Sequence, residues 1–232
     1  MRLASLMFDF NVQELALLTG LQKCLHERFA KGCGCTYMMR EFDVFPGVFP
    51  PRHDSMALVR SMKIEKGQRV LDVCCGSGVI GLFALARGAG QVVGLDISPA
   101  AVSCARLNAK KQRRVQRKYE ARESDCLSAL QPGELFDVVV FNPPYRDLPA
   151  KNLIERTMWD PNLAVHRAFF SGIGAHLAPG GKIYFAQANF GPLREVDKIL
   201  QQNGWTANLL DREKLPDMKG IEFFAFEATK KS

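Results

Sequence analysis

The chain has 232 residues, a formal net charge of +7 and 47% hydrophobic residues. These values fit one globular unit with a sizeable core, and no apolar run is long enough for a transmembrane helix. The first residues resemble a signal peptide only briefly, because Asp9 and Glu14 interrupt the apolar region. We therefore expect a cytoplasmic protein that has no membrane partner.

The chain contains seven cysteines, an odd number that favours reduced thiols over a disulfide framework. Cys24, Cys33 and Cys35 resemble a fragment of a metal site. The usual second cysteine pair and a histidine at ligand spacing do not accompany them. The sequence therefore predicts no metal site.

The N-terminal part of the chain predicts one helix followed by an irregular segment. Residues 11–30 form an amphipathic pattern, with an apolar stripe made by Leu15, Leu18, Leu25 and Phe29. Residues 35–51 are rich in aromatic side chains but are broken by prolines and a glycine, so we expect no regular element there. Taken from its residues alone, this segment fits a core better than a lid. Asp54 and Ser55 are then predicted to cap a helix that runs to about Lys63.

The next stretch has the pattern of a strand, a glycine turn and a helix. Arg69–Val73 is an apolar run typical of a buried strand, and Gly76-Ser77-Gly78 leads into the apolar segment Val79–Ala86. Glycine lacks Cβ and so lets the backbone approach a nucleotide-like ligand closely. A second strand ends at Asp96, where a carboxylate can accept hydrogen bonds from ribose hydroxyls.

Helices and strands alternate through the remainder of the chain. The predicted helices are residues 98–112, which Ser98 caps, 162–177 and 193–202; the predicted strands are residues 117–122, 136–141, 182–188, 205–210 and 222–227. Such alternation indicates an open, mostly parallel α/β sheet. We find no internal repeat and no domain linker.

Much of the positive charge lies in residues 110–118. A cluster of this kind can bind the phosphates of a nucleic acid. It can also be the solvated end of a helix, where cations complement the helix dipole. The second interpretation is favoured, because no aromatic residue that could stack on a base interrupts the run.

Four polar residues, Asp72, Asp96, Asp125 and Asn142, fall at or just beyond the ends of predicted strands. Each alone is explained by a turn or a helix cap. Ligands of open α/β sheets bind at the carboxyl ends of the strands, so the four together predict one pocket.

Asn142-Pro143-Pro144-Tyr145 is the most specific pattern in the chain. The two prolines fix φ and make the loop stiff. The side-chain oxygen of Asn142 and the carbonyl of Pro143 can then accept two hydrogens from one nitrogen, and Tyr145 offers a flat face to a planar or cationic group. The pattern contains no strong base, so we expect it to act by positioning and desolvation.

With these residues the chain resembles the class I S-adenosylmethionine-dependent methyltransferases that carry Asn/Asp-Pro-Pro-Tyr/Phe. That group includes release-factor glutamine methyltransferases and enzymes that act on exocyclic amines of nucleic-acid bases. The resemblance covers about residues 45–228 and follows the family order from Phe49–Ser55 through Leu71–Gly78 to Asn142–Tyr145. It implies a Rossmann-like, mostly parallel seven-stranded sheet, with its last strand antiparallel and helices on both faces.

The resemblance also implies the roles of individual residues, with S-adenosylmethionine as the cofactor. The cofactor-binding set is Asp72, Cys74, Gly76, Ser77, Gly78, Asp96, Ile97, Asp125, Cys126 and Asn142. Asn142, Pro143 and Tyr145 are expected to hold the accepting nitrogen. Residues 1–49 are expected to form a helix and an aromatic lid, and residues 50–232 the catalytic domain; the lid side chains are Tyr37, Phe45, Phe49 and Pro51.

The chain departs from the family pattern at two places. Cys74 stands where the family usually has glycine, so a Cβ there narrows the pocket or shifts the methionine portion of the cofactor. Only about 45 residues precede the shared region, whereas release-factor enzymes carry a longer N-terminal domain. With the family in view, this favours a lid over a small acceptor.

The leading hypothesis is transfer of a methyl group to an amide or amine nitrogen of a small substrate. A second hypothesis is the reaction of an azetidine-2-carboxylate synthase, in which S-adenosylmethionine is the sole substrate and its own α-amine displaces methylthioadenosine. A third is an RNA-binding protein or RNA-base methyltransferase that uses residues 110–118. No feature of the sequence identifies the acceptor or the oligomeric state.

Overall fold

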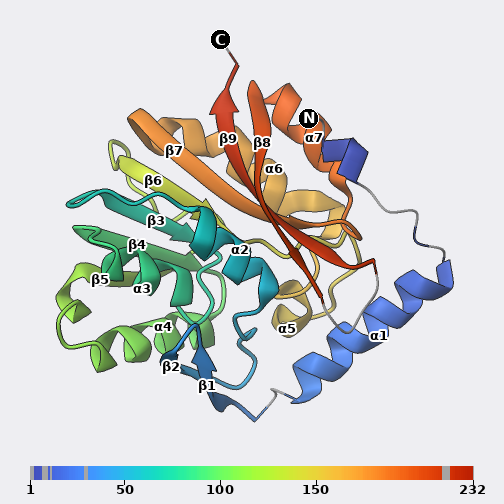
Figure 1. Ribbon diagram of the computed structural model, residues 1–232, viewed down its shortest axis with the longest axis horizontal. Helices are drawn as coiled ribbons and strands as arrows, with labels where there is room; N and C mark the ends of the chain where they lie inside the picture. Colours follow the sequence, from blue (N-terminus) through green and yellow to red (C-terminus); the bar gives the residue numbers. More distant parts are fainter. Residues whose placement is uncertain (1–2, 7–9, 11, 29–30, 216–219, 232) are drawn as a thin grey trace.

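The computed structural model describes residues 3–6, 10, 12–28, 31–215 and 220–231. Its centre is a seven-stranded sheet in the order β5-β4-β3-β6-β7-β9-β8 (Figure 1). Strands β3 to β7 are parallel to one another, and β9 is antiparallel to both β7 and β8. The predicted mostly parallel, seven-stranded sheet with an antiparallel last strand is therefore confirmed.

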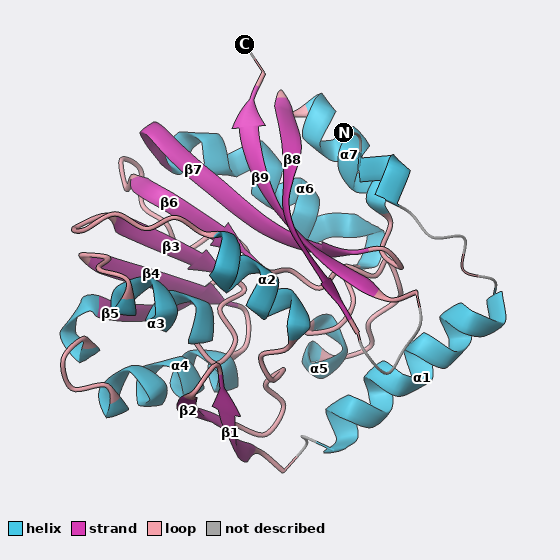
Figure 2. Ribbon diagram, viewed as in Figure 1, coloured by secondary structure: helices cyan, strands magenta, loops and turns pink. Residues whose placement is uncertain are grey.

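The elements alternate along the chain as the pattern predicts (Figure 2). The strands of the main sheet are β3 (Arg69–Val73), β4 (Gln91–Asp96), β5 (Tyr119–Glu123), β6 (Phe136–Phe141), β7 (Leu177–Ala188), β8 (Trp205–Lys214) and β9 (Glu222–Lys230). The α-helices are α1 (Val12–Arg28), α2 (His53–Ser61), α3 (Val79–Ala86), α4 (Pro99–Lys111), α5 (Leu153–Arg156), α6 (Ala164–Gly172) and α7 (Leu193–Gln202). The predicted helix over residues 162–177 is a short 3-10 turn, then α6, then a second 3-10 turn (Ile173–His176).

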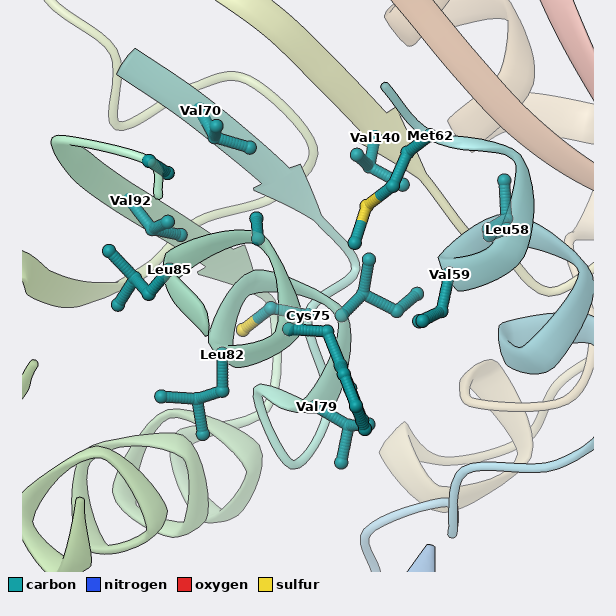
Figure 3. Packing of buried hydrophobic residues seen from close by; sticks show 14 of the residues in the cluster. Leu58, Val59, Met62, Val70, Cys75, Val79, Leu82, Leu85, Val92 and Val140 are labelled. Atoms are coloured by element: carbon teal, nitrogen blue, oxygen red, sulfur yellow. The ribbon is translucent and has the colours of Figure 1, made fainter. Parts of the chain in front are cut away.

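The core lies on both faces of the sheet, because successive side chains of a strand point to opposite sides. On one face Val70, Val92 and Val140 pack against α2 and α3 (Figure 3). On the other face Leu71, Val93 and Val139 pack with residues of α6 and α7. Strands buried on both faces need the continuous apolar runs that the sequence contains.

Aromatic rings fill the second face. The ring of Phe141 stacks on Phe169 with centroids 3.9 Å apart, and Phe170 meets Phe185 edge to face at 5.4 Å. The indole nitrogen of Trp205 donates a hydrogen bond of 3.0 Å to the Phe170 carbonyl, so its polar atom is satisfied although the side chain is buried. These contacts fix the carboxyl end of β6, from which the Asn-Pro-Pro-Tyr loop begins.

One expectation about residues 35–51 is wrong. Strands β1 (Cys33–Tyr37) and β2 (Arg40–Val44) form an antiparallel hairpin where we expected no regular element. Its two turn residues, Met38 and Met39, have φ values of 47° and 62°, and positive φ at both positions matches the twist of a tight hairpin. The prolines and the glycine begin only at Pro46, after the hairpin, and the rings of Tyr37 and Phe42 pack into the core beside Phe83.

Several other boundaries also differ from the predictions. Helix α2 has Arg52 as its N-cap and ends at Ser61, so Asp54 and Ser55 lie in its first turn and do not cap it. Strand β7 begins at Leu177, and the Pro-Gly-Gly segment forms a register shift inside it. Strands β8 and β9 both run several residues past their predicted ends, because they pair with each other over most of their length. Phe29 of the predicted apolar stripe lies outside the described residues.

Two general properties complete the description. The cysteines, all of which fall in the described ranges, are free thiols, as the sequence indicates. In the described ranges no helix has both the length and the apolar character needed to cross a membrane.

Gly81 of α3 provides a test of how closely the helix approaches the sheet. A Cβ at this position would lie 2.7 Å from Val92 Cγ1 and 2.8 Å from Tyr119 Cε2. We expect Gly81→Ala to lower the free energy of unfolding by about 1–3 kcal/mol, measured by urea denaturation. The matched control is Gly20→Ala on α1, where a Cβ would meet no atom within 4 Å. Equal effects of the two substitutions would contradict the close packing of α3.

Candidate active site

A cavity opens at the carboxyl ends of β3, β4 and β6, where the sequence predicts a pocket. Counted with the open solvent at its mouth, its empty space is about 1130 Å³. Residues of the loop before α2, of the turn after β3, of the ends of β4 and β5, and of the segment after β6 line it.

The turn after β3 forms one wall of the cavity. Cys74, Gly76 and Gly78 all have positive φ, at 61°, 54° and 78°. A Cβ on Gly78 would lie 2.9 Å from both Ala105 Cβ and the Tyr119 hydroxyl, so only glycine fits there. Cys74 adopts a backbone conformation that favours glycine. The residue as a whole is half-buried, and desolvation of its thiol raises the pKa of that group.

Asp96 connects that turn to β4. One carboxylate oxygen accepts a hydrogen bond of 2.9 Å from the Gly76 N–H, and the other accepts one of 2.9 Å from the Ser98 N–H. Burial raises the pKa of Asp96, and these two backbone hydrogen bonds oppose the shift. Asp96 thus stabilises the turn, while each oxygen keeps a lone pair for a ligand.

Asp72 lies behind the turn and does not line the cavity. It is fully buried, and its Oδ2 accepts a hydrogen bond of 2.9 Å from the Gly81 N–H of α3, whereas its Oδ1 has no partner. Burial, with a smaller effect of nearby Asp96, raises the pKa of Asp72 to about 7. Its place in the structure is therefore to hold the first turn of α3 against the sheet.

Asn142 follows β6 and has its two amide atoms in different surroundings. Its Nδ2 donates hydrogen bonds of 3.2 Å to Asp54 Oδ2 and of 3.2 Å to Ser55 Oγ, both from the first turn of α2. Its Oδ1 is buried and has no partner among the described residues. A buried acceptor without a partner is costly, so a ligand that donated to this oxygen would relieve that cost.

Tyr145 closes the same loop. Its ring is buried and meets Phe190 and Phe223 edge to face at 5.8 and 6.3 Å. Its hydroxyl donates to Asp54 Oδ2 at 3.5 Å. Burial raises the pKa of Tyr145 well above its usual value, so the phenol stays protonated.

Helix α1 packs against this loop. Arg146 directly follows Tyr145, and its guanidinium donates a hydrogen bond of 2.7 Å to the Thr19 hydroxyl of α1. Leu18 of α1 is buried in the same apolar cluster as Tyr145 and Phe223. The N-terminal helix therefore contacts the predicted acceptor side of the cavity.

The structure brings together most of the residues that the sequence predicts for the site. The residues that line the cavity are Phe49, Pro51, Cys74, Gly76, Ser77, Asp96, Ile97, Asp125, Cys126, Asn142, Pro143 and Tyr145. Asp72, Gly78, Tyr37 and Phe45 do not line it. Tyr37 donates a hydrogen bond of 2.6 Å to the Arg52 carbonyl within the core, and Phe45 packs against the cluster of Val44, Val48, Ala101 and Cys104.

Sequence reasoning missed the part that Asp54 and Ser55 take in the site. They lie in the stretch Phe49–Ser55 that carries the family resemblance, but a Ser or Asp before a helix also fits a cap, and that interpretation was preferred. The structure adds Arg156 of α5, which lies 3.6 Å from Asp125 across the mouth. This pair is exposed and contributes little to stability.

The lining of the cavity is acidic although the chain has a net charge of +7. Its charged residues are Asp54, Asp96, Asp125 and Arg156. Burial disfavours the ionised forms of Asp54 and Asp96, so a bound cation would be stabilised there. The described residues include no group of three or more His, Cys, Asp or Glu side chains that could hold a metal ion.

Comparison with known sequences places the cavity in context. A family model described as "Methyltransferase small domain" matches residues 41–210. The chain is 32% identical over 201 residues to a release factor glutamine methyltransferase of Koribacter versatilis, an alignment that covers 78% of this chain and 67% of the relative. It is 31% identical over 191 residues to the enzyme of the same name from Clostridium acetobutylicum, covering 75% and 66%. The chain thus spans about two thirds of the length of these relatives.

Solved structures agree on the fold. A 16S rRNA methyltransferase of T. thermophilus, in complex with AdoMet and guanosine, superposes with a TM-score of 0.63 at 23% identity over 87% of this chain and 50% of that chain. An E. cuniculi complex responsible for the methylation of a translation termination factor superposes with a TM-score of 0.55 at 21% identity, covering 80% and 99%.

The raised pKa of Asp72 predicts a pH-dependent stability. The unfolded chain loses this proton near pH 4, whereas the folded protein keeps it until about pH 7, so folding becomes less favourable between these values. The total effect is roughly 4 kcal/mol at most. We expect Asp72→Asn, which resembles the protonated form, to be more stable than wild type near pH 8 but not near pH 4, measured by chemical denaturation. A difference between the two proteins that is equal at both pH values would contradict this assignment.

Proposed function

Because the chain belongs to the methyltransferase small domain family and is an S-adenosylmethionine-dependent transferase, we propose that it methylates the nitrogen of a primary amide or primary amine in a small acceptor. The observation that carries the proposal is that Asn142 lines the cavity and that its buried Oδ1 has no partner among the described residues.

The residues present fit the cofactor. S-adenosylmethionine carries positive charge, and the cavity has carboxylates whose ionised forms burial disfavours. We assign the methionine portion to the turn with Cys74, Gly76 and Ser77, and the ribose to Asp96, whose oxygens keep free lone pairs. The adenine side belongs to Ile97, Asp125 and Cys126, while Asp72 and Gly78 support the turn from behind.

When bound, S-adenosylmethionine supplies the electrophilic methyl group that becomes attached to the accepting nitrogen. The chain holds that nitrogen in place. Asn142 Oδ1 and the Pro143 carbonyl accept hydrogen bonds from its two N–H groups, and its lone pair stays free. Both N–H bonds of Asn142 Nδ2 already point to Asp54 and Ser55. The Asn142 side chain therefore presents its oxygen, and no N–H group, to the substrate that receives the methyl group. A nitrogen with two hydrogens satisfies this arrangement, whereas a hydroxyl has too few.

Tyr145 and its neighbours shape the acceptor side. The face of its ring, supported by Phe190 and Phe223, can cover a planar group and stabilise the positive charge that develops on nitrogen. Phe49 and Pro51 also line the cavity, and α1 packs outside Tyr145. We therefore propose that α1 and Phe49 cover the acceptor side of a catalytic domain made by residues 50–232.

The comparisons support amide chemistry but leave the acceptor as a proposal. The relatives are named for a glutamine of a release factor, and the T. thermophilus structure contains guanosine. The side-chain amide nitrogen of glutamine and the N2 nitrogen of guanosine each carry two hydrogens. The basic run 110–118 gives a nucleic acid less support, because α4 begins at Pro99, just after β4 ends beside the cavity, and the run lies at the other end of that helix.

Substitution of Asn142 tests the proposal. With methyl-labelled S-adenosylmethionine and a panel of primary amides and amines, we expect label in an acceptor and an about 100-fold or larger loss of kcat/KM in Asn142→Ala. Asn203→Ala, which removes a side chain at the end of α7, should keep wild-type turnover. Full turnover by Asn142→Ala would refute the role of the amide. Methylthioadenosine released from S-adenosylmethionine alone would instead support the cyclisation reaction.

The two-acceptor grip also predicts a single methylation. After one methyl transfer the nitrogen has lost one of its two hydrogens. Either Asn142 Oδ1 or the Pro143 carbonyl then has no N–H group to accept from. We expect the singly methylated product, offered as a substrate, to show a kcat/KM at least about tenfold lower than the parent compound, measured by mass spectrometry. Dimethylated product formed at a comparable rate would show that the grip does not need two hydrogens.

A further inference from the structure

We propose that Asp54 is a positioning residue whose ionised carboxylate locks the Asn142 amide with its oxygen facing the acceptor. The proposal rests on the proposed function, because it explains how the carboxamide is kept in the orientation that methyl transfer to nitrogen requires. It assigns to α2 a part in the chemistry that its sequence pattern did not indicate.

The two ends of a carboxamide have almost the same shape, so its neighbours decide which end faces a ligand. An ionised carboxylate can only accept hydrogen bonds. Asp54 Oδ2 lies 3.2 Å from the Asn142 amide atom that points to α2, and that atom must therefore be the nitrogen. The oxygen is thereby directed away from α2, and it has no partner within the described residues.

Ser55 reinforces the same direction. Its Oγ accepts the second N–H of Asn142 at 3.2 Å and donates its own hydrogen to Asp54 Oδ1 at 3.4 Å. The Ser55 N–H donates to Asp54 Oδ1 at 2.8 Å. Three of these hydrogen bonds end on the carboxylate, and the fourth ends on Ser55 Oγ, which itself donates to the carboxylate, so Asp54 sets the direction of all four.

Asp54 also reaches the other residue of the acceptor grip, because the Tyr145 hydroxyl donates to its Oδ2 at 3.5 Å. The carboxylate is 5% exposed and lies in the first turn of α2, a helix that packs against the sheet. One buried group therefore positions both Asn142 and Tyr145, and it is held by a rigid element and not by a loop.

Protonation of Asp54 would weaken the lock. A protonated carboxyl carries a donor, to which Asn142 could turn its oxygen, and the amide would then offer its nitrogen to the acceptor. Burial raises the pKa of Asp54, while its hydrogen bonds and the Arg52 guanidinium oppose the shift. The other titratable groups near it are Tyr37 and Tyr145, which stay protonated, and His53 next to it in α2, which pairs with Glu213. The lock is therefore intact at high pH and is lost as the pH falls through the raised pKa of Asp54.

The first experiment reads the lock without turnover. In the cofactor-free protein, the two side-chain amide protons of Asn142 are assigned in a ¹H–¹⁵N NMR spectrum by their loss in Asn142→Asp. We expect both resonances to move as the pH is lowered through the raised pKa of Asp54, with a midpoint that is absent in Asp54→Asn. If the chemical shifts of these two resonances change neither with pH nor in Asp54→Asn, the proposal is overturned.

The second experiment reads the consequence for the reaction. We expect Asp54→Asn to lower kcat up to about 100-fold, because an amide can face Asn142 with either end, and to leave the KM for S-adenosylmethionine nearly unchanged. The acid limb of the wild-type pH–rate profile should share the NMR midpoint and vanish in the variant. Ser55→Ala, which keeps the carboxylate, should lose less activity, and Asp197→Asn on the outer side of α7 should keep wild-type turnover.

The outcomes separate the two proposals. If no acceptor is methylated but the Asn142 resonances follow Asp54, the proposed function fails and the lock stands. If methyl transfer depends on Asn142 while Asp54→Asn keeps the wild-type rate and acid limb, the proposed function stands and the lock is wrong. An equal loss of rate in Asp54→Asn at every pH, with a raised KM for the cofactor, would show general disruption of the site and would overturn the positioning role.

Discussion

The site depends on one constraint of a parallel sheet, which is that neighbouring strands end at the same edge. The ends of β3, β4 and β6 carry polar groups that no further strand can pair with, so these groups must find partners in turns, in helix ends or in a ligand. Asp96 accepts a hydrogen bond from the backbone of the glycine turn, and the side-chain nitrogen of Asn142 donates one to Asp54 of α2. The oxygen of Asn142 has no partner among the described residues, so it is available to a donor on a ligand.

Electrostatics give the cavity a character that the whole chain does not have. A chain with a net charge of +7 buries Asp54 and Asp72, and half-buries Asp96, within or directly behind one pocket. Ionised carboxyls that are poorly solvated are unfavourable in the free protein, and a cation between them relieves that cost. The same acids that destabilise the empty fold thus favour a sulfonium cofactor, which is how binding sites commonly trade stability for function.

The sheet and most of the cavity could be predicted, because local patterns determine both. Val138, Val139 and Val140 form an apolar run that only a buried strand explains, and the glycine turn and Asn142 fall where such strands end. The hairpin turn at Met38 and Met39 could not be predicted, because neither residue is a usual turn former. Asp54 was placed in a helix cap because its long-range partner, 88 residues away at Asn142, leaves no trace in local sequence. For the same reason, the structure alone shows that Tyr37 and Phe45 pack inward while Phe49 and Pro51 face the cavity.

The central claim concerns the direction of one carboxamide beside a bound cofactor. A crystal structure of the chain with S-adenosylhomocysteine and a primary amide tests it most directly, especially at a resolution that separates nitrogen from oxygen, or with neutrons. The account predicts the cofactor product against the Cys74–Gly78 turn and the amide nitrogen about 3 Å from Asn142 Oδ1, with Nδ2 still on Asp54. Nδ2 facing the ligand, or the cofactor product bound elsewhere, would contradict it.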